Sequence, residues 1–436
     1  MATYLNRTPS SASNRKTWTY STWLKRSSIT TDSVIFAAGS GTVEFTAYFK
    51  SGGTMEVYQY DSGTYRFRYI TNQVFRDPSA WYHIVIACDT TQGSASDRVK
   101  IYVNGSQITS FSTNTTPSQN QDTSVNLNTP HVLGRYHTSA SGYYLGYMAQ
   151  TILVDGTALT SSSFGSTNAN GIWVPNTSPS VTYGNNGFRL QFAGTGTSAD
   201  SSGFGADTSG NNNHFTSNSL GTNPNTKDTP HNNFSLMNPL NIYPNSTPII
   251  TDGGLKTQSQ STSAAGLCST MAVSAGKWYA EGKIGSGATL EVGAVDIGSH
   301  AFNKTGTTTN SVAYDYGGNI RVNNSNTQTG LSTYTGGDII GILLNMDTAT
   351  GTVTFYKNGS AVGSAQNFTT SKPEFAAFYM QSHTSGGNQS VEWNLGNPTF
   401  AIASSNADAN GYGNFEYAVP SGYYALCTKN LAQYGG

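Results

Sequence analysis

Charged side chains are scarce in this sequence: Asp, Glu, Lys and Arg make up 10% of the chain, and the formal net charge is −1. Because so little net charge gives no long-range field for a polyanion, we expect no binding to nucleic acid. Long apolar runs are also lacking, and the residues after Met1 do not form the apolar segment of a signal peptide. We therefore expect a soluble chain with no membrane insertion and no export through a signal peptide.

Cysteine is nearly absent as well, with three residues at Cys88, Cys268 and Cys427. An odd number without a Cys-x-x-Cys pair does not build a disulfide framework, and the apolar surroundings predict buried free thiols. The seven histidines do not have the spacing of a zinc site. Heptads and a regular helical period are missing too, so we expect neither a coiled-coil shaft nor a helical domain.

Aromatic residues and turn formers are abundant instead, with 12% Phe, Trp and Tyr and 48 glycines. Disordered chains lack aromatics and carry high net charge, so this composition favours folded structure. It is typical of short strands joined by many turns. A chain of 436 residues is too long for one β core, and we expect two domains.

One pattern occurs twice, over residues 80–105 and 337–359. An apolar run is followed by an Asp, a turn rich in small residues, an alternating run and Asn-Gly, at Asn104-Gly105 and at Asn358-Gly359. Asn-Gly between alternating runs predicts a hairpin, because both central residues of a type I′ turn need a positive φ. The repeat predicts two β domains of related architecture.

The predicted domains are residues 1–220 and 251–436, joined by an extended Pro/Asn/Gly-rich linker over 221–250. The sequence leaves open whether the strand at 187–192 and the Gly/Asn-rich segment at 199–216 complete the first domain. The fold class is all-β, with two antiparallel sandwiches. Further strands are expected at 17–26, 33–40, 42–50, 55–60, 65–70, 131–135, 144–156, 276–284, 289–297, 311–316, 374–380 and 390–396.

The first domain resembles LamG-type, concanavalin A-like domains. The resemblance lies in a Trp-Tyr-His strand at 81–83, the Tyr-Val-Asn-Gly hairpin at 102–105, Leu-Gly-Arg at 133–135 and the strand at 144–156. It covers about residues 15–165 and implies a jelly-roll sandwich. It does not imply one function, because this fold carries lectins, adhesion modules and glycanases.

The second domain resembles SPRY domains. The residues that carry this resemblance include Gly-Lys-Trp-Tyr at 276–279, Gly-Asp at 337–338, Phe-Tyr-Lys-Asn-Gly at 355–359 and Asn-Leu-Gly at 394–396. Nearly the whole family pattern is present. The resemblance implies a second two-sheet sandwich that acts as a binding module.

Nearly the whole chain also resembles structural proteins of tailed bacteriophages. The segments 6–26, 209–216, 228–240 and 419–435 carry this resemblance. It implies a virion surface protein, made in the host cytoplasm, of the tail-fibre or tail-tip type. Its expected partners are other virion proteins, further copies of itself, with a trimer favoured, and a host surface glycan or protein. Capsid decoration is the alternative location.

A glycan-cleaving enzyme is the second alternative, and it needs two carboxylates facing one cleft. A Glu-x-Asp-x-Glu strand does not occur in the sequence, so we expect no enzyme. Glu281 and Glu392 lie on predicted strands of the second domain and could approach each other, but we expect both to be structural carboxylates. The glutamates are scattered through the sequence, at Glu44, Glu56, Glu281, Glu291, Glu374, Glu392 and Glu416.

No cofactor is required by this interpretation, and Ca²⁺ is the ion that the sequence could hold. Asp200, Asp207 and Asn211 offer the hard oxygen ligands that calcium prefers. Their spacing is not that of a 12-residue calcium loop. The alternative is a turn-rich loop whose side chains satisfy one another.

Glycan binding needs aromatic faces and hydrogen-bonding groups on loops at the ends of a sandwich. The candidates lie beside Ser/Gly- and Gly/Asn-rich turns. The alternative for each tyrosine is packing in the core or between subunits. The candidate residues are Arg135, Tyr143, Tyr144, Tyr314, Tyr316, Asn319 and Tyr334.

Overall fold

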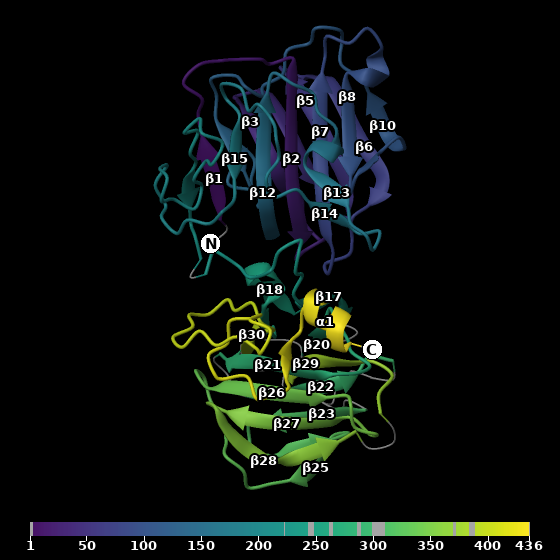
Figure 1. The fold of residues 1–436 in the computed structure, drawn as a ribbon, viewed down its shortest axis with the longest axis vertical. Helices are drawn as coiled ribbons and strands as arrows, with labels where there is room; N and C mark the ends of the chain where they lie inside the picture. Colours follow the sequence, from purple (N-terminus) through teal and green to yellow (C-terminus); the bar gives the residue numbers. More distant parts are fainter. Residues whose placement is uncertain are drawn as a thin grey trace. The chain divides into compact units, whose positions relative to one another are not determined.

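The computed structural model divides into two compact units, residues 1–225 and 226–436 (Figure 1). Each unit is built almost entirely of antiparallel strands, as the sequence predicted. Among the described residues, no helix is long and apolar enough to cross a membrane. The structure describes residues 3–221, 223–242, 248–260, 265–285, 289–298, 310–368, 372–382 and 389–435.

The N-terminal unit contains an eight-stranded and a six-stranded sheet. The eight-stranded sheet has the order β10 (Phe111–Thr115), β6 (Thr64–Val74), β5 (Thr54–Asp61), β4 (Val43–Phe49), β3 (Ser33–Ser40), β11 (His131–Leu133), β1 (Tyr4–Arg7) and β16 (Thr216–Asn218). The six-stranded sheet has the order β15 (Phe188–Leu190), β12 (Gly146–Asp155), β2 (Thr17–Arg26), β7 (Trp81–Asp89), β8 (Val99–Val103) and β9 (Ser106–Gln107). A separate ribbon pairs β13 (Gly165–Thr167) with β14 (Trp173–Pro175).

Alternation along the strands builds the core between these two sheets. In β4, Phe45, Ala47 and Phe49 are fully buried in the main cluster, together with Trp18 and Tyr20 of β2. Side chains at the positions between them therefore lie on the opposite face of the sheet. Trp81, at the first position of β7, is only half-buried.

The segment after residue 165 completes this first sandwich. β15 pairs with β12, and β16 pairs with β1, so the chain returns to both sheets of the N-terminal unit. This settles the question that the sequence left open over residues 187–216. Strand β1 lies between β11 and β16, so β16 is the edge strand on this side of the eight-stranded sheet.

The C-terminal unit also contains two sheets. The seven-stranded sheet has the order β17 (Met237–Ile242), β20 (Gly266–Ser269), β29 (Ala376–Ser382), β22 (Leu290–Asp296), β23 (Ser311–Asp315), β24 (Ile320–Val322) and β25 (Ser325–Gln328). The second sheet has the order β18 (Ile249–Thr251), β19 (Lys256–Gln258), β30 (Ser390–Asn394), β21 (Lys277–Ile284), β26 (Ile339–Asn345), β27 (Thr352–Lys357) and β28 (Ser360–Asn367), with β31 (Tyr424–Ala425) parallel to β21.

Residues 226–242 and 248–251 do not form the extended linker that the sequence predicted. They belong to the compact C-terminal unit, where β17 pairs with β20 and β18 pairs with β19. Near the end of the chain lies the short helix α1 (Thr428–Tyr434). Seven residues are too few to show a helical period, so the sequence did not predict this helix. Single 3-10 turns occur at Ala95–Asp97, Ser161–Ser163 and Asp252–Gly254.

Candidate binding face of the N-terminal unit

The outer face of the eight-stranded sheet carries polar and aromatic side chains from β4 and β5. The register places Glu44 opposite Tyr60, Thr46 opposite Tyr58, and Tyr48 opposite Glu56. These positions alternate with the core residues of β4, so their side chains point away from the core. Two carboxylates and three tyrosines therefore share one face.

Glu56 fixes the centre of this face. Its carboxylate accepts hydrogen bonds from Tyr48 Oη at 2.8 Å, Lys50 Nζ at 2.8 Å and Arg68 Nε at 2.7 Å. Only 1% of Glu56 is exposed. Burial by itself would raise the pKa of Glu56, but the hydrogen bonds from Arg68, Lys50 and Tyr48 outweigh it and hold the pKa below its ordinary value.

Glu44 is the second carboxylate of this face, and it contacts the loop 134–145. It accepts a hydrogen bond from Tyr58 Oη at 2.6 Å, and its Oε2 lies 3.1 Å from His137 Nδ1. Burial opposes ionisation, yet the contacts with His137 and Tyr58 leave the pKa of Glu44 below its ordinary value. The His137 side chain is 2% exposed, and neither ring nitrogen has a hydrogen bond of good geometry within the described residues.

Five tyrosines form a row of contacting rings on this face, which we call the tyrosine band: Tyr48, Tyr58, Tyr60, Tyr65 and Tyr136. Tyr48 and Tyr58 are buried, and Tyr60 and Tyr136 are half-buried. Ring centroids are 6.0 Å apart for Tyr48 and Tyr136, 6.2 Å for Tyr48 and Tyr58, 5.5 Å for Tyr58 and Tyr65, and 5.0 Å for Tyr60 and Tyr65. The outermost ring, Tyr65, is 40% exposed.

The Arg68 guanidinium lies 4.5 Å from the centre of the Tyr65 ring. Because Arg68 also binds Glu56, it joins the exposed end of the tyrosine band to the buried carboxylate. Hydroxyl contacts thus orient the rings of Tyr48 and Tyr58, and the guanidinium contact orients Tyr65.

The predicted residues Arg135 and Tyr143 both pack against Tyr4 of β1. The Arg135 guanidinium lies 3.8 Å from the centre of the Tyr4 ring, and Tyr143 lies 6.3 Å from Tyr4. Tyr144, one residue further, faces inward: it is buried in the core and donates a hydrogen bond to Lys25 O at 3.0 Å. The two neighbouring side chains point in opposite directions, so Tyr143 remains partly exposed. The prediction that Tyr144 binds a ligand is wrong, because Tyr144 is a core residue.

The four candidates in the C-terminal unit do not form one site. Tyr314 and Tyr334 are buried, with ring centroids 5.1 Å apart, and Tyr334 Oη donates to Leu290 O at 2.7 Å. Asn319 donates to the Asp315 carboxylate at 3.1 Å. Only Tyr316 is well exposed, at 39%. The packing alternative thus describes Tyr314 and Tyr334.

The candidate calcium ligands are engaged with the protein. The Asp207 carboxylate accepts the backbone N–H groups of Arg189, Ser209 and Asn213, and Asp200 accepts from Ser202. The Asn211 amide donates to Gly184 O at 2.6 Å and to Gly187 O at 3.0 Å. Among the described residues, no three acidic, His or Cys side chains are grouped to hold a metal ion.

The carboxylates of the binding face are too far apart for a glycosidase pair. Glu44 faces Tyr60, which lies four positions along β5 from Glu56, so the two backbone positions are about 13 Å apart along the strand. Retaining and inverting glycosidases hold their two carboxyl groups roughly 5 to 10 Å apart. The face therefore offers aromatic and hydrogen-bonding contacts, not an acid/base pair.

Glu281 and Glu392 of the C-terminal unit do not form a pair either. Glu281 is fully buried and accepts from Tyr279 Oη, Asn394 Nδ2 and two backbone N–H groups of the C-terminal segment. Glu392 is bound 3.1 Å from Lys256 Nζ. Both are structural carboxylates, as the sequence suggested.

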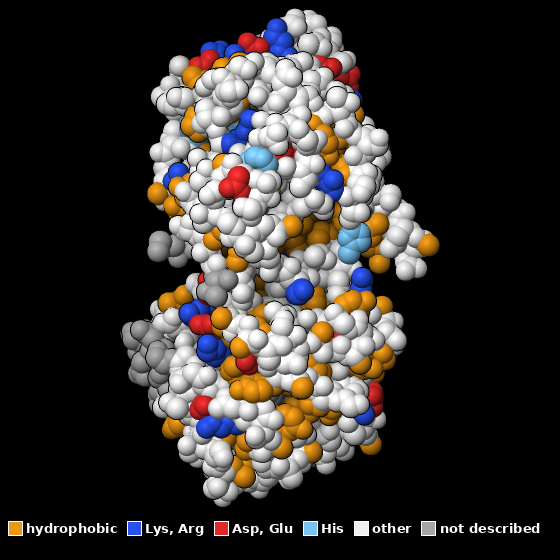
Figure 2. All heavy atoms as spheres, turned by 60° about the vertical axis from the view of Figure 1, so that its left-hand side comes forward, with side chains coloured by type: hydrophobic (Ala, Val, Ile, Leu, Met, Phe, Trp, Pro, Cys, Tyr) orange, Lys and Arg blue, Asp and Glu red, His pale blue; other side chains and the backbone are white. Residues whose placement is uncertain are grey.

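Charged side chains are sparse on the face of the molecule that Figure 2 shows. On the face drawn in Figure 2, charged side chains lie singly or in small groups among uncharged atoms.

The sequence did not point to Tyr48, Tyr58, Tyr60, Tyr65 or Tyr136. The signal that could have found most of them is the alternation of tyrosines with apolar residues over 43–69.

The sheet orders define the fold class of the chain, that of two antiparallel β-sandwiches. Comparison with family models supports this assignment. Residues 2–163 match the Laminin_G_3 family, described as the concanavalin A-like lectin/glucanases superfamily, and residues 277–398 match the SPRY domain. Both are carbohydrate- or protein-binding folds, so the chain contains a LamG-like domain and a SPRY domain.

Comparison with curated proteins gives no match. Among solved structures, the SPRY domain of human HERC1 is 22% identical over 36% of this chain and 96% of its own, with a TM-score of 0.31. A heptameric SAP-like pentraxin from Limulus polyphemus is 16% identical over 41% and 87%, with a TM-score of 0.29. Domain 4 of AbnA, an arabinanase from Geobacillus stearothermophilus in complex with arabinotriose, is 18% identical over 34% and 65%, with a TM-score of 0.27.

Proposed function

We propose that this protein is a non-catalytic adhesion protein that binds cell-surface glycans through the tyrosine band. The observation that carries the proposal is a row of contacting tyrosine rings that ends on the exposed Tyr65, in which Glu56 fixes the hydroxyl of Tyr48 and Glu44 fixes that of Tyr58. Aromatic rings bind the C–H faces of sugars, while polar groups bind their hydroxyls. Rings that are already ordered lose little conformational entropy on binding.

The location of the protein is a second part of the proposal. The sequence resembles structural proteins of tailed bacteriophages, and we infer a virion surface protein of the tail-fibre or tail-tip type, made in the host cytoplasm. Other virion proteins and further copies of the chain, as a trimer, are its proposed partners. Edge strands such as β10 and β28 are surfaces on which such contacts can form.

Glycan binding is tested with the full chain on immobilised host polysaccharides. Tyr65→Ala removes the most exposed ring of the band, and we expect it to weaken binding about tenfold, a loss of about 1.4 kcal/mol. The matched control is Tyr316→Ala, because Tyr316 is 39% exposed and Tyr65 is 40% exposed. A chelator should leave binding unchanged, since the proposal requires no metal.

Two results would contradict this proposal. Binding that survives Tyr65→Ala would remove the tyrosine band from recognition. Binding that is lost with Tyr316→Ala instead would transfer recognition to the C-terminal unit.

The location is tested by cryo-electron microscopy of purified particles. Density for this chain at the tail supports host attachment. Density on the capsid lattice would indicate capsid decoration in place of host attachment. Absence of the chain from the particles would refute the proposal that it is a virion protein.

A further inference from the structure

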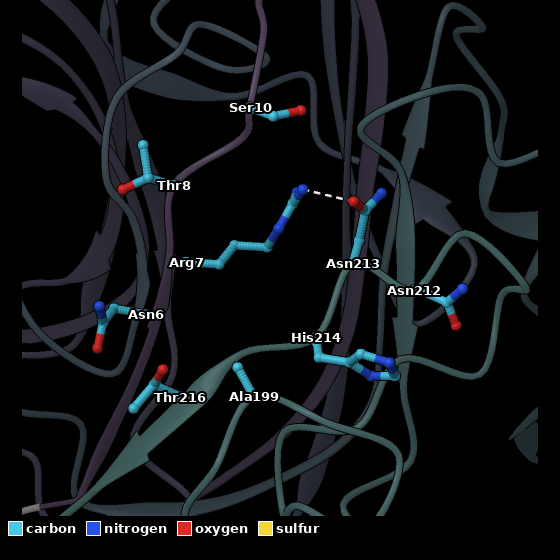
Figure 3. A pocket seen from close by; sticks show the side chains of 9 residues that line it. All are labelled: Asn6, Arg7, Thr8, Ser10, Ala199, Asn212, Asn213, His214 and Thr216. Atoms are coloured by element: carbon cyan, nitrogen blue, oxygen red, sulfur yellow. Dashed lines mark hydrogen bonds between the residues drawn. The ribbon is translucent and has the colours of Figure 1, made fainter.

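A polar pocket of about 430 Å³ lies beside β1, outside the tyrosine band (Figure 3). Strand β1 and the residues after it form one wall, and the segment 199–216 forms the other. Figure 3 shows the Arg7 side chain reaching across the pocket to Asn213. The lining residues are Asn6, Arg7, Thr8, Ser10, Ala199, Asn212, Asn213, His214 and Thr216.

Arg7 supplies the only charged side chain among these nine lining residues, histidine apart. Its Nη1 donates to Asn186 O at 3.2 Å and its Nη2 to Asn213 Oδ1 at 2.5 Å. The guanidinium also lies 6.0 Å from the centre of the buried Phe215 ring. Burial lowers the pKa of Arg7 to about 10, and Asp207 acts in the opposite direction. Arg7 therefore remains a cation at neutral pH.

The positive charge of Arg7 has no ion-pair partner within the described part of the chain. The acidic residues near the segment 199–216 are Asp200 and Asp207. Asp207 is occupied by backbone N–H groups and by Ser209, and Asp200 by Ser202. Neutral oxygens alone accept from the guanidinium, and its other N–H groups are left for a ligand.

The rest of the pocket is suited to hydroxyl groups. Thr8, Ser10 and Thr216 contribute hydroxyls, and Asn212 contributes an amide. His214 Nδ1 accepts the backbone N–H of Asp207 at 2.9 Å, so in the neutral ring the proton lies on Nε2, which can donate. Polar groups of this kind bind the hydroxyls of a sugar ring, and a volume of about 430 Å³ accommodates a small saccharide.

We propose that this pocket binds an acidic sugar, with the anionic group of the ligand on Arg7 and its hydroxyls on the surrounding side chains. A guanidinium binds a carboxylate, sulfate or phosphate through parallel N–H donors, which a neutral sugar cannot match. This inference rests on the proposed function in one respect, that the ligand is a saccharide. It adds a second site with a defined chemical class.

The test is calorimetric titration of the full chain with glucuronic acid, a sulfated glucose, a phosphorylated glucose and unmodified glucose. We expect at least one anionic sugar to bind about tenfold more tightly than glucose. The ranking of the three anionic sugars identifies the carboxylate, sulfate or phosphate as the preferred group. Arg7→Met should abolish the preference for anionic sugars.

Asn212→Asp provides a second variant that does not disturb the anchoring of Arg7. Asn212 is exposed and has a φ of 58°, which Asp tolerates, so the substitution adds a negative charge to the pocket without strain. We expect about a tenfold loss of affinity for anionic sugars and no change for glucose. Arg66→Met is the control. Arg66 forms an ion pair with Asp61, with an N–O distance of 3.0 Å, and does not line the pocket.

Equal affinity for glucose and all anionic sugars would overturn the inference, as would a preference that survives both Arg7→Met and Asn212→Asp. Tyr65→Ala should leave the preference unchanged. Failure of the tyrosine band and failure of the pocket are therefore distinguishable in one set of titrations.

Discussion

Single buried carboxylates hold loops onto the sheets in both units. In the C-terminal unit, Glu281 on β21 accepts the backbone N–H groups of Glu416 at 3.0 Å and Tyr417 at 2.8 Å. Burial raises the pKa of Glu281, and the donors around it act in the opposite direction. One carboxylate thus attaches the C-terminal segment to the sheet.

Glu281→Gln should destabilise the C-terminal unit, because the amide presents its own N–H₂ group to donors that need an acceptor. We expect a loss of about 1–3 kcal/mol in the free energy of unfolding, measured by denaturant titration. Glu392→Gln is the matched control on the neighbouring strand β30. Its carboxylate is 27% exposed and bound to Lys256, so its loss should cost less than about 1 kcal/mol. Equal losses would show that Glu281 does not anchor the segment.

Glu56 should make the stability of the N-terminal unit depend on pH. Its pKa in the folded unit lies below the ordinary 4.5, so between these two values the unfolded chain binds more protons than the folded one. The stabilisation is complete above the ordinary pKa and is lost as the pH falls through the folded value. We expect the melting temperature of the wild type to fall more steeply with acid than that of Glu56→Gln. Parallel curves for the two proteins would contradict this expectation.

At the scale of elements, the hairpins were the most predictable feature. Asn104 and Gly105 have φ values of 47° and 87°, and Asn358 and Gly359 have values of 49° and 79°. Both pairs therefore have the positive φ that the sequence predicted, and each follows two paired strands, β7 and β8 before Asn104 and β26 and β27 before Asn358. A local turn requirement leaves a local signature in the sequence.

Two hairpin glycines separate backbone strain from crowding in the N-terminal unit. A Cβ at Gly105 would lie 2.7 Å from Trp173 Cε3, whereas at Gly63, with a φ of 96°, no described atom lies within 4 Å. Alanine at either position costs roughly 1–2 kcal/mol through the left-handed backbone. Gly105→Ala should cost about 1 kcal/mol more in denaturant titrations, because it displaces a ring that donates to His83 Nδ1. Equal costs would mean that the ribbon with Trp173 moves freely.

The short strands could not be predicted, because their pairing partners lie far away in the chain. Tyr4–Arg7 pairs with Thr216–Asn218, and three or four residues are too few to show a period. The candidate site follows the same rule. Alternation separates Tyr143 from Tyr144, but the contact between Tyr136 and Tyr48 depends on how a loop folds over three strands.

At the scale of the molecule, each unit has its own core and its own buried thiols. Cys88 lies in the core of the N-terminal unit, and Cys268 and Cys427 lie in clusters of the C-terminal unit. Burial raises the pKa of Cys268 to about 12 and also raises the pKa values of Cys88 and Cys427. Since the thiolate is the reactive form, all three should be inert in the folded chain.

Pulse labelling with a thiol reagent across a denaturant series can therefore follow the two units separately, with each cysteine quantified by mass spectrometry of its peptide. We expect Cys268 and Cys427 to become reactive in one transition and Cys88 in another, because separate cores unfold as separate cooperative units. Cys88→Ser should leave the transition of the other two unchanged. A single transition for all three would show that the units unfold together. Labelling of Cys427 before Cys268 would show that the segment held by Glu281 detaches while the SPRY sandwich remains folded, and would make that segment a separate unit of stability.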